Sequence, residues 1–193
     1  MRRSVCTLLT LAMIAAFAIT AFAGDEKPAA GQDPMQLIMP GEHHAHMAKL
    51  AGNFDYTLKM WMDPAAPPTE STGKRTAELI LGGRYLVEKY NGQFMGMPFE
   101  GQSIMAYDNV QKKYLGTWID NMGTGIMFTS GSCDGKGTWT MSGDMADPAT
   151  GKMVSTRSVT KIVDDNTFVM EMYAPGPDGK EVKAMEVTAK RAK

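Results

Sequence analysis

The sequence has few cysteines, few histidines and no large excess of charge of either sign. Only 2 of its 193 residues are Cys and 3 are His, and 20 Lys and Arg stand against 21 Asp and Glu. Proteins that bind nucleic acid derive much of their affinity from a basic surface facing the phosphates. A formal net charge of −1 therefore argues against a nucleic-acid partner.

The motifs of the common enzyme classes are also absent. The chain has no Gly-x-Ser-x-Gly, no P-loop and no dinucleotide fingerprint. Its histidines, His43, His44 and His46, lie within four residues of one another, so none is expected on a strand beside a Ser or Cys nucleophile. Glu171 and Glu186 are a candidate pair for acid–base catalysis. Arg157 and Lys161 are predicted on the same face, however, which favours a row of solvent-exposed ion pairs. Enzymatic activity is not expected, although an unrecognised hydrolase stays open, and no organic cofactor is predicted.

One apolar run is long, and it lies at the N-terminus. Residues 1–3 are Met-Arg-Arg, residues 5–22 are mostly apolar, and Ala21-Phe22-Ala23 supplies the small residues that signal peptidase needs. This pattern predicts a signal peptide over residues 1–23, cleaved after Ala23, and a periplasmic or secreted protein. The alternative is an uncleaved anchor, because a membrane span needs roughly 17–25 residues. No later run is that long, so no stable membrane insertion is expected after cleavage.

Cleavage removes Cys6 and leaves Cys133 as the single cysteine. The mature chain then forms no intramolecular disulfide. Cys133 lies at a predicted hairpin tip beside the carboxylate of Asp134, where Lys136 is the only nearby cation that could activate a thiol. An inert thiol is expected there, in preference to a reactive centre or a dimer link.

The rest of the chain divides into a tether and one domain. Residues 24–41 show little periodicity and predict a flexible linker, while residues 42–50 predict one or two helical turns. Beyond Gly52, short alternating stretches lie between turn pairs such as Asp134-Gly135 and Asp178-Gly179. The predicted strands are 53–62, 73–81, 84–91, 99–107, 113–120, 124–132, 136–143, 152–163, 166–174 and 180–191. Closure hides the edges of such a meander, so residues 42–193 are predicted to form an all-β, antiparallel up-and-down barrel of about ten strands with a short N-terminal helix.

The last two hairpins favour one register. A two-residue turn at Asp178-Gly179 predicts the pairs Met172–Met185, Met170–Val187, Phe168–Ala189, Glu171–Glu186 and Tyr173–Ala184. A three-residue loop over 164–166 adds Ile162, Thr160 and Ser158 to the apolar side, and Lys161, Val159 and Arg157 to the charged side. A one-residue slip would invert every side chain, so the agreement of both hairpins predicts that the apolar side faces the barrel interior.

The two ends of the barrel sequence contain a further pair. Phe54 starts the first strand, and Arg191 is a charge at the end of an otherwise apolar face. An aromatic ring beneath an arginine of the last strand resembles the calycin or lipocalin signature, here with Gly52-Asn53-Phe54 where that signature has Gly-x-Trp. We expect a cation–π contact between Phe54 and Arg191, worth about 0.5–2 kcal/mol, to close the barrel.

Over the whole domain the sequence resembles the family called domain of unknown function 1579. The segments that carry the resemblance are 81–86 (Leu-Gly-Gly-Arg-Tyr-Leu), 98–101 (Pro-Phe-Glu-Gly), 107–109 (Tyr-Asp-Asn), 118–125 (Trp-Ile-Asp-Asn-Met-Gly-Thr-Gly) and 185–187 with Arg191. The resemblance implies a calycin-like barrel and no particular activity. Phe54 stands where the family often has Trp.

Methionine is unusually abundant, with 18 residues, and its flexible side chain suits an apolar cavity. The residues predicted to line the lumen are Tyr56, Met60, Met62, Trp118, Asp120, Met170, Met172 and Met185. Ligand pockets combine apolar walls with a few placed polar groups, which Tyr56, Trp118 and Asp120 would supply. The sequence therefore predicts a barrel that binds a small apolar or amphipathic molecule.

Two other functions stay open. Imidazole and thioether ligands favour copper, so His43, His44 and His46, together with methionine pairs such as Met60 and Met62, suggest a copper carrier. Alternatively the interior is simply packed and the barrel acts through a surface that binds a protein partner. The oligomeric state is left open.

Overall fold

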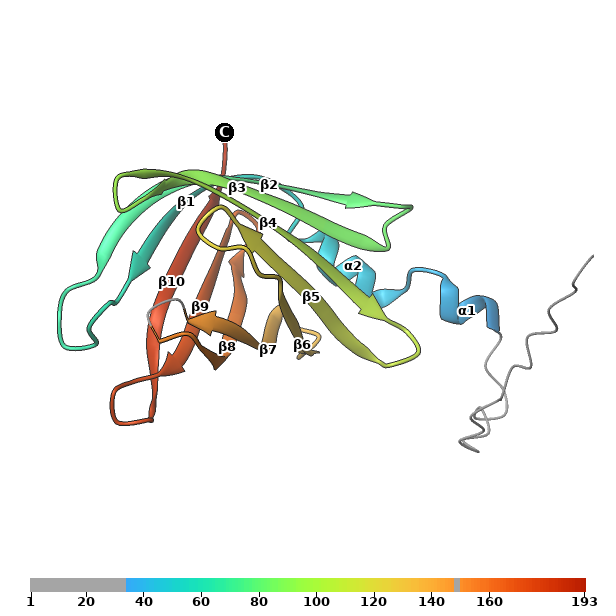
Figure 1. The fold of residues 1–193 in the computed structure, drawn as a ribbon. Helices are drawn as coiled ribbons and strands as arrows, with labels where there is room; N and C mark the ends of the chain where they lie inside the picture. The colour runs from blue at the N-terminus through green and yellow to red at the C-terminus, as the bar shows by residue number, and fades with distance from the viewer. Residues whose placement is uncertain (1–33, 148–149) are drawn as a thin grey trace, which may run out of the picture. The chain divides into compact units, whose positions relative to one another are not determined.

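The computed structural model describes residues 34–147 and 150–193, so the predicted signal peptide and most of the predicted linker lie outside the described residues. Two short helices, α1 (Pro34–Ile38) and α2 (Glu42–Ala48), precede ten strands (Figure 1). The strands are β1 (Gly52–Met60), β2 (Thr69–Ile80), β3 (Tyr85–Phe94), β4 (Met97–Asp108), β5 (Lys113–Asp120), β6 (Met127–Cys133), β7 (Thr138–Asp147), β8 (Lys152–Asp164), β9 (Thr167–Pro175) and β10 (Glu181–Arg191).

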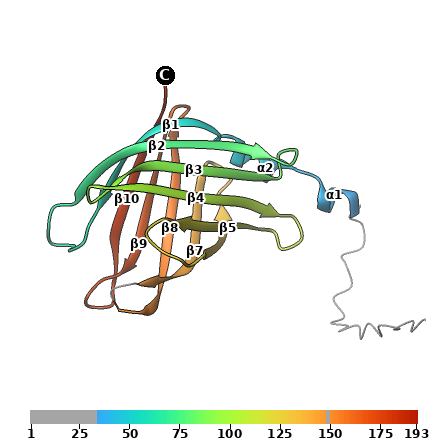
Figure 2. The same cartoon turned by 45° about the horizontal axis from the view of Figure 1, so that its top comes forward.

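The strands form one closed antiparallel barrel. Each pairs with its neighbours along the chain, and β1 closes the sheet by pairing with β10 (Figures 1 and 2). This confirms the predicted ten-stranded up-and-down barrel. Closure leaves no unpaired strand edge, which is the physical advantage of this architecture for a long meander.

Side-chain alternation decides which residues enter the core. In β1, Phe54 and Tyr56 are buried while Asp55 between them is exposed. The same period of two is clear in β2 and β7, because successive side chains of a strand point to opposite faces. The buried apolar core consists of Met47, Leu50, Phe54, Tyr56, Ala77, Leu86, Tyr114, Trp139, Met141, Phe168, Val187 and Ala189.

Helix α2 and the turn after it lie at one end of the barrel, which we call the covered end. The chain passes from α2 directly into β1, so α2 lies at the end where β1 starts. Successive strands run in opposite directions, so the turns after β2, β4, β6 and β8 lie at that same end. Met47 and Leu50, from α2 and the turn after it, are 0% and 2% exposed and insert into the core there. The turns after β1, β3, β5, β7 and β9 surround the opposite end, which we call the open end.

The predicted register of the last hairpins is confirmed except near the turn. Met172 pairs with Met185, Met170 with Val187, and Ser158 with Met172. The predicted pair of Tyr173 with Ala184 is wrong, because a bulge between Lys183 and Met185 makes Lys183 the partner of Tyr173. A bulge places an extra residue in one strand, so the pairing shifts by one beyond it.

Within the predicted linker, residues 34–38 form α1 and the chain after it is held on the barrel. Asn109 donates from Nδ2 to the carbonyl of Met39 at 2.9 Å and to that of Leu37 at 3.2 Å. Arg84 donates from Nη2 to the carbonyl of Ile38 at 2.9 Å. These contacts were not visible in sequence periodicity because they join residues that are 46–72 positions apart.

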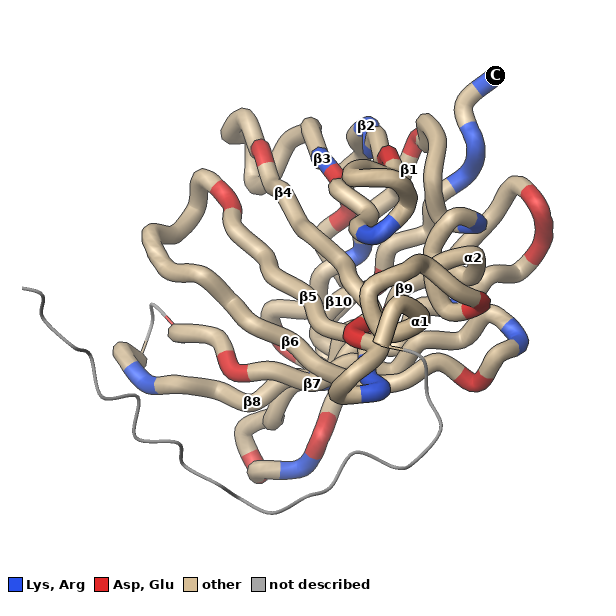
Figure 3. The backbone as a smooth tube through the Cα atoms, turned by 90° about the vertical axis from the view of Figure 1, so that its right-hand side faces the viewer, with Lys and Arg blue, Asp and Glu red and all other residues tan. Residues whose placement is uncertain are grey.

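Charged residues of both signs are interspersed over the strands and turns (Figure 3). None of the described helices is long and apolar enough to cross a membrane.

Candidate functional site

Three methionines form a row on the interior face near the open end. Met60 of β1 pairs with Met185 of β10, and Met185 pairs with Met172 of β9. Met170 lies one inward position deeper, opposite Val187. The methionines are partly exposed whereas Val187 is buried, so the apolar interior surface becomes accessible toward the open end. Four of the five predicted lumen methionines are thus on the interior face.

The fifth predicted lumen methionine, Met62, is not in the lumen. β1 ends at Met60, and Met62 lies in the following turn with 73% of its surface exposed. The strand alternation that would have turned Met62 inward stops because the ladder of β1 with its neighbours ends at Met60.

Aromatic rings line another part of the interior. The rings of Tyr56 and Tyr90 lie 5.8 Å apart, those of Tyr90 and Trp118 lie 5.3 Å apart, and those of Trp118 and Phe99 lie 6.4 Å apart. Trp118 donates from Nε1 to Asp120 Oδ2 at 2.7 Å, so these two predicted site residues do contact each other. Asp120 Oδ1 also accepts the N–H of Met122 at 2.9 Å and thereby closes the turn after β5.

Two glycines make room for Tyr56. A Cβ at Gly92 would lie 2.6 Å from the Tyr56 hydroxyl, and a Cβ at Gly73 would approach the same hydroxyl even more closely. Any side chain at either position would displace the tyrosine from the wall. Burial raises the pKa of Tyr56, so its hydroxyl stays protonated and can donate a hydrogen bond.

A buried ionic network lies deeper in the interior, and sequence analysis missed it. Arg75 of β2 is 1% exposed and makes an ion pair with Glu88 of β3, whose other oxygen accepts from the Ser103 hydroxyl. Arg75 Nε also donates to the Tyr90 hydroxyl at 3.2 Å. Burial opposes the charge of Arg75, yet Glu88 and Tyr90 raise its pKa overall. The missed signal was a charged residue at an inward position, between Gly73 and Ala77.

The covered end contains the predicted cation–π contact. The Arg191 guanidinium lies 4.6 Å from the centre of the Phe54 ring, and Arg75 lies 5.1 Å from the same ring. Arg191 Nη1 also donates to the Ala51 carbonyl at 3.0 Å. Gly52 has φ of +123°, a backbone conformation that favours glycine, and a Cβ there would collide with Arg191.

The rings of His43 and His46 lie 6.0 Å apart, but the three histidines do not converge on one point. His43 stacks on Tyr107 with the ring centres 3.8 Å apart, whereas His44 is 6% exposed and accepts the Gly41 N–H on Nδ1 at 3.0 Å. His46 Nε2 lies 3.8 Å from Glu42. No three His, Cys, Asp or Glu side chains in the described ranges are grouped to hold a metal. The histidines lie at the covered end, so they cannot share an ion with the methionine row at the open end.

The candidate carboxylate pair is bridged by a lysine. Glu171 and Glu186 are opposite each other as predicted, and Lys183 Nζ lies 3.1 Å from Glu171 and 2.6 Å from Glu186. Hydrogen bonds from Tyr173 and Lys183 lower the pKa of Glu171, which makes it a poor proton donor at neutral pH. Arg157, one of the cations predicted beside these carboxylates, instead pairs with Glu181 at 2.6 Å.

Cys133 is the one cysteine among the described residues. It is partly buried at the end of β6, pairs with Trp139 in the ladder, and packs against the core. It therefore lies in the strand itself, while the turn begins at Asp134.

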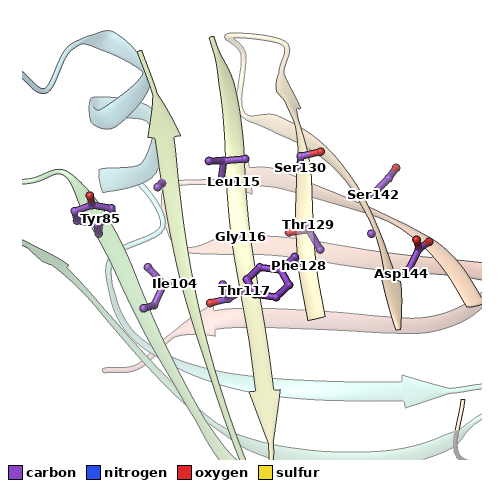
Figure 4. Close-up of a pocket in the computed structure, with 12 residues that line it drawn as sticks. Tyr85, Ile104, Leu115, Gly116, Thr117, Phe128, Thr129, Ser130, Ser142 and Asp144 are labelled. Atoms are coloured by element: carbon purple, nitrogen blue, oxygen red, sulfur yellow. The ribbon is translucent and has the colours of Figure 1, made fainter. Parts of the chain in front are cut away.

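A groove of about 550 Å³ lies on the outer face of the sheet, over β3 to β7 (Figure 4). Tyr85, Ile104 and Phe128 line it and are 37%, 40% and 67% exposed. Ser130, Ser142 and Asp144 form its polar side. These side chains belong to the outward-facing set of their strands, so the groove is separate from the interior walls described above.

The comparison with protein families is decisive for classification. A sequence profile of the proteins of unknown function called DUF1579 matches residues 39–191, which is most of the chain. The chain belongs to the DUF1579 family. The comparison with curated proteins found no match.

Solved structures similar to this DUF1579 protein are barrels. Rv2717c from M. tuberculosis shares 13% identity, with 80% of this chain and 99% of that chain covered and a TM-score of 0.56. A redesigned β-barrel shares 14% identity, with 76% of this chain and 94% of that chain covered and a TM-score of 0.41. At this level of identity, the likeness to Rv2717c supports the fold alone.

Proposed function

We propose that this DUF1579 protein binds a small apolar or amphipathic molecule through the open end of its barrel. The observation that carries the proposal is the set of inward-facing apolar side chains that stay partly exposed near that end, the methionine row above all. When a ligand covers apolar surface that was in contact with water, the free energy falls by about 25 cal/mol per Å² of that surface.

The interior walls favour a ligand with an apolar body and at least one hydrogen-bonding group. Met60, Met172 and Met185 offer soft apolar contacts, and Trp118 and Tyr90 offer flat aromatic faces. A carboxylate oxygen accepts more than one hydrogen bond, so Asp120 retains acceptor capacity beyond its bonds to Trp118 and Met122. A hydroxyl or amine on the ligand would complement Asp120.

The proposal includes export of the protein. Its support is the sequence of residues 1–23, with a basic start, an apolar run and small residues before the cleavage position. An exported carrier would meet its ligand outside the cytoplasm.

Native mass spectrometry of the protein, produced from the full-length sequence and purified from its exported fraction, tests the proposal. We expect a population that retains an organic molecule of defined mass, and a mature mass that begins after Ala23. A protein that arrives bare and gains no mass from a lipid or metabolite extract would contradict the ligand-binding proposal.

A charge placed in the interior locates the binding site. Met185→Lys puts an ammonium group on the proposed ligand surface, whereas Met153→Lys adds the same charge at a 66% exposed position. We expect the affinity for 1-N-phenylnaphthylamine, an apolar fluorescent probe, to fall about ten-fold or more in the first variant and to stay unchanged in the second. Equal affinity in both variants would place the probe elsewhere.

A further inference from the structure

We propose that Met60, Met172 and Met185 form a binding site for a soft monovalent metal ion, with Cu(I) as the expected occupant. The three residues lie on three adjacent strands, and Met185 on the central strand pairs directly with both others. The site is separate from the histidine cluster, and it does not depend on whether an organic ligand also enters the barrel.

Strand geometry brings the three thioethers within reach of one ion. Adjacent strands are about 4.8 Å apart, and directly opposed side chains start from Cβ atoms about 4.5–5.5 Å apart. A methionine side chain has three rotatable bonds, so its sulfur can reach across the spacing between neighbouring strands. The sulfurs of Met60 and Met172 can therefore approach that of Met185 from both sides and give three ligands to one ion.

A β-bulge lies directly beside the central methionine. The pairing of β10 with β9 shifts between Lys183 and Met185, and the carbonyl of the extra residue, Ala184, accepts the Trp61 N–H at 2.9 Å. Bulges redirect neighbouring side chains and are enriched beside functional sites. Here the bulge changes the direction of β10 at the residue that would contribute the middle ligand.

The surroundings of the row suit a soft ion of low charge. Thioether sulfur selects Cu(I) over hard cations, which prefer oxygen ligands. The row continues with Ser158 on one side and Thr69 on the other, both uncharged. The charged neighbours Lys183 and Glu186 form an ion pair on the outer face of β10. With neutral ligands and no carboxylate in the row, Mg²⁺ and Ca²⁺ would find no suitable partner.

Titration with Ag(I), a redox-stable ion that also prefers thioethers, tests the site in protein produced from the full-length sequence. We expect one Ag(I) per chain by native mass spectrometry, and competition with bicinchoninate for Cu(I) under anaerobic conditions. Met185→Leu should weaken metal affinity by about ten-fold or more, while Met153→Leu, at an exposed position of β8, should leave it unchanged.

Leucine keeps the interior apolar and nearly unchanged in volume, so the same variants separate the metal site from the proposed function. If Met185→Leu loses the metal while its urea midpoint and circular-dichroism spectrum stay those of the unaltered protein, the metal site is supported, whatever the affinity for 1-N-phenylnaphthylamine. If Met60→Leu, Met172→Leu and Met185→Leu all bind Ag(I) as tightly as the unaltered protein, the metal proposal is wrong, whatever the probe does.

Discussion

At the scale of single residues, the barrel contains a charge pair in its interior. Arg75 and Glu88 are buried together, and Arg75 reaches from β2 to the Leu50 carbonyl at 2.8 Å. Isolated buried charges are costly, but a pair whose hydrogen bonds are satisfied offsets much of that cost. Arg75 therefore connects the chain after α2 to the barrel wall, while Glu88 balances its charge and the Tyr90 hydroxyl accepts a hydrogen bond from its Nε.

Removal of one partner should leave the other as an uncompensated buried charge. We expect Arg75→Met to lower the free energy of unfolding by about 3–5 kcal/mol, measured by urea denaturation followed by tryptophan fluorescence. Lys74→Met is the matched control, because Lys74 lies next in the strand and pairs with Asp55 at 3.7 Å on the exposed surface. That control should cost less than about 1 kcal/mol. Similar losses in both variants would show that Arg75 is not a structural anchor.

At the scale of elements, α2 covers one end of the barrel and depends on a neutral histidine. His44 packs beside Tyr107 with the ring centres 6.0 Å apart and is almost fully buried. Burial, followed by the nearby charges of His43 and Arg84, lowers the pKa of His44 below its ordinary value of 6.5. The helix is therefore docked most firmly when His44 carries no charge.

This docking makes stability depend on pH in a defined direction. The unfolded chain binds a proton on His44 near pH 6.5, whereas the folded chain binds it only at lower pH. The contribution of His44 is thus complete above pH 6.5 and is lost as the pH falls through its folded pKa. We expect urea midpoints to fall between pH 7 and pH 5, and to fall less in His44→Gln.

His46→Gln is the control for this experiment. His46 lies on the same helix, and its Nε2 is 3.8 Å from Glu42. The contact with the Tyr107 ring is made by His44. The pH dependence should persist in His46→Gln. If it disappears there and persists in His44→Gln, the assignment to His44 is wrong.

At the scale of the whole molecule, stability depends on the seam where the first and last strands meet. β1 and β10 pair from Phe54 with Arg191 to Met60 with Met185. Ala192 N–H extends the seam by donating to the Asn53 carbonyl at 2.9 Å. The same seam brings two of the three methionines of the proposed metal site together, so closure and that site depend on one strand pairing.

A chain that ends at Gly179 should not form the barrel. Loss of β10 leaves β1 and β9 as long unpaired edges, which promote aggregation. We expect aggregation in size-exclusion chromatography and no cooperative thermal transition, whereas a chain lacking only Lys193 should behave as the unaltered protein. A monomeric truncated chain that unfolds cooperatively would show that the remaining nine strands close without β10.

The sequence by itself determined the fold class, the ten strands and the inward faces of β1, β8, β9 and β10. These features follow from alternation and turn residues, which act between near neighbours in the chain. The sequence also predicted the contact of Phe54 with Arg191 and placed Trp118 and Asp120 on one strand face, whereas their hydrogen bond appeared only in the structure. Met62 was wrongly placed in the lumen because β1 ends at Met60, and Ala184 was wrongly paired with Tyr173 because of the bulge in β10. Both a strand end and a bulge depend on the partner strand.

Apart from the contact of Phe54 with Arg191 and the neighbours across the last hairpins, the tertiary structure decided which distant residues meet. Met60 and Met185 are 125 positions apart, and only the closure of β1 on β10 places them side by side. The pairing of Arg75 with Glu88 and the separation of the histidines from the methionines have the same origin. Local periodicity tells which way a side chain faces, whereas its neighbours across the sheet are set by register and closure, which are properties of the whole barrel.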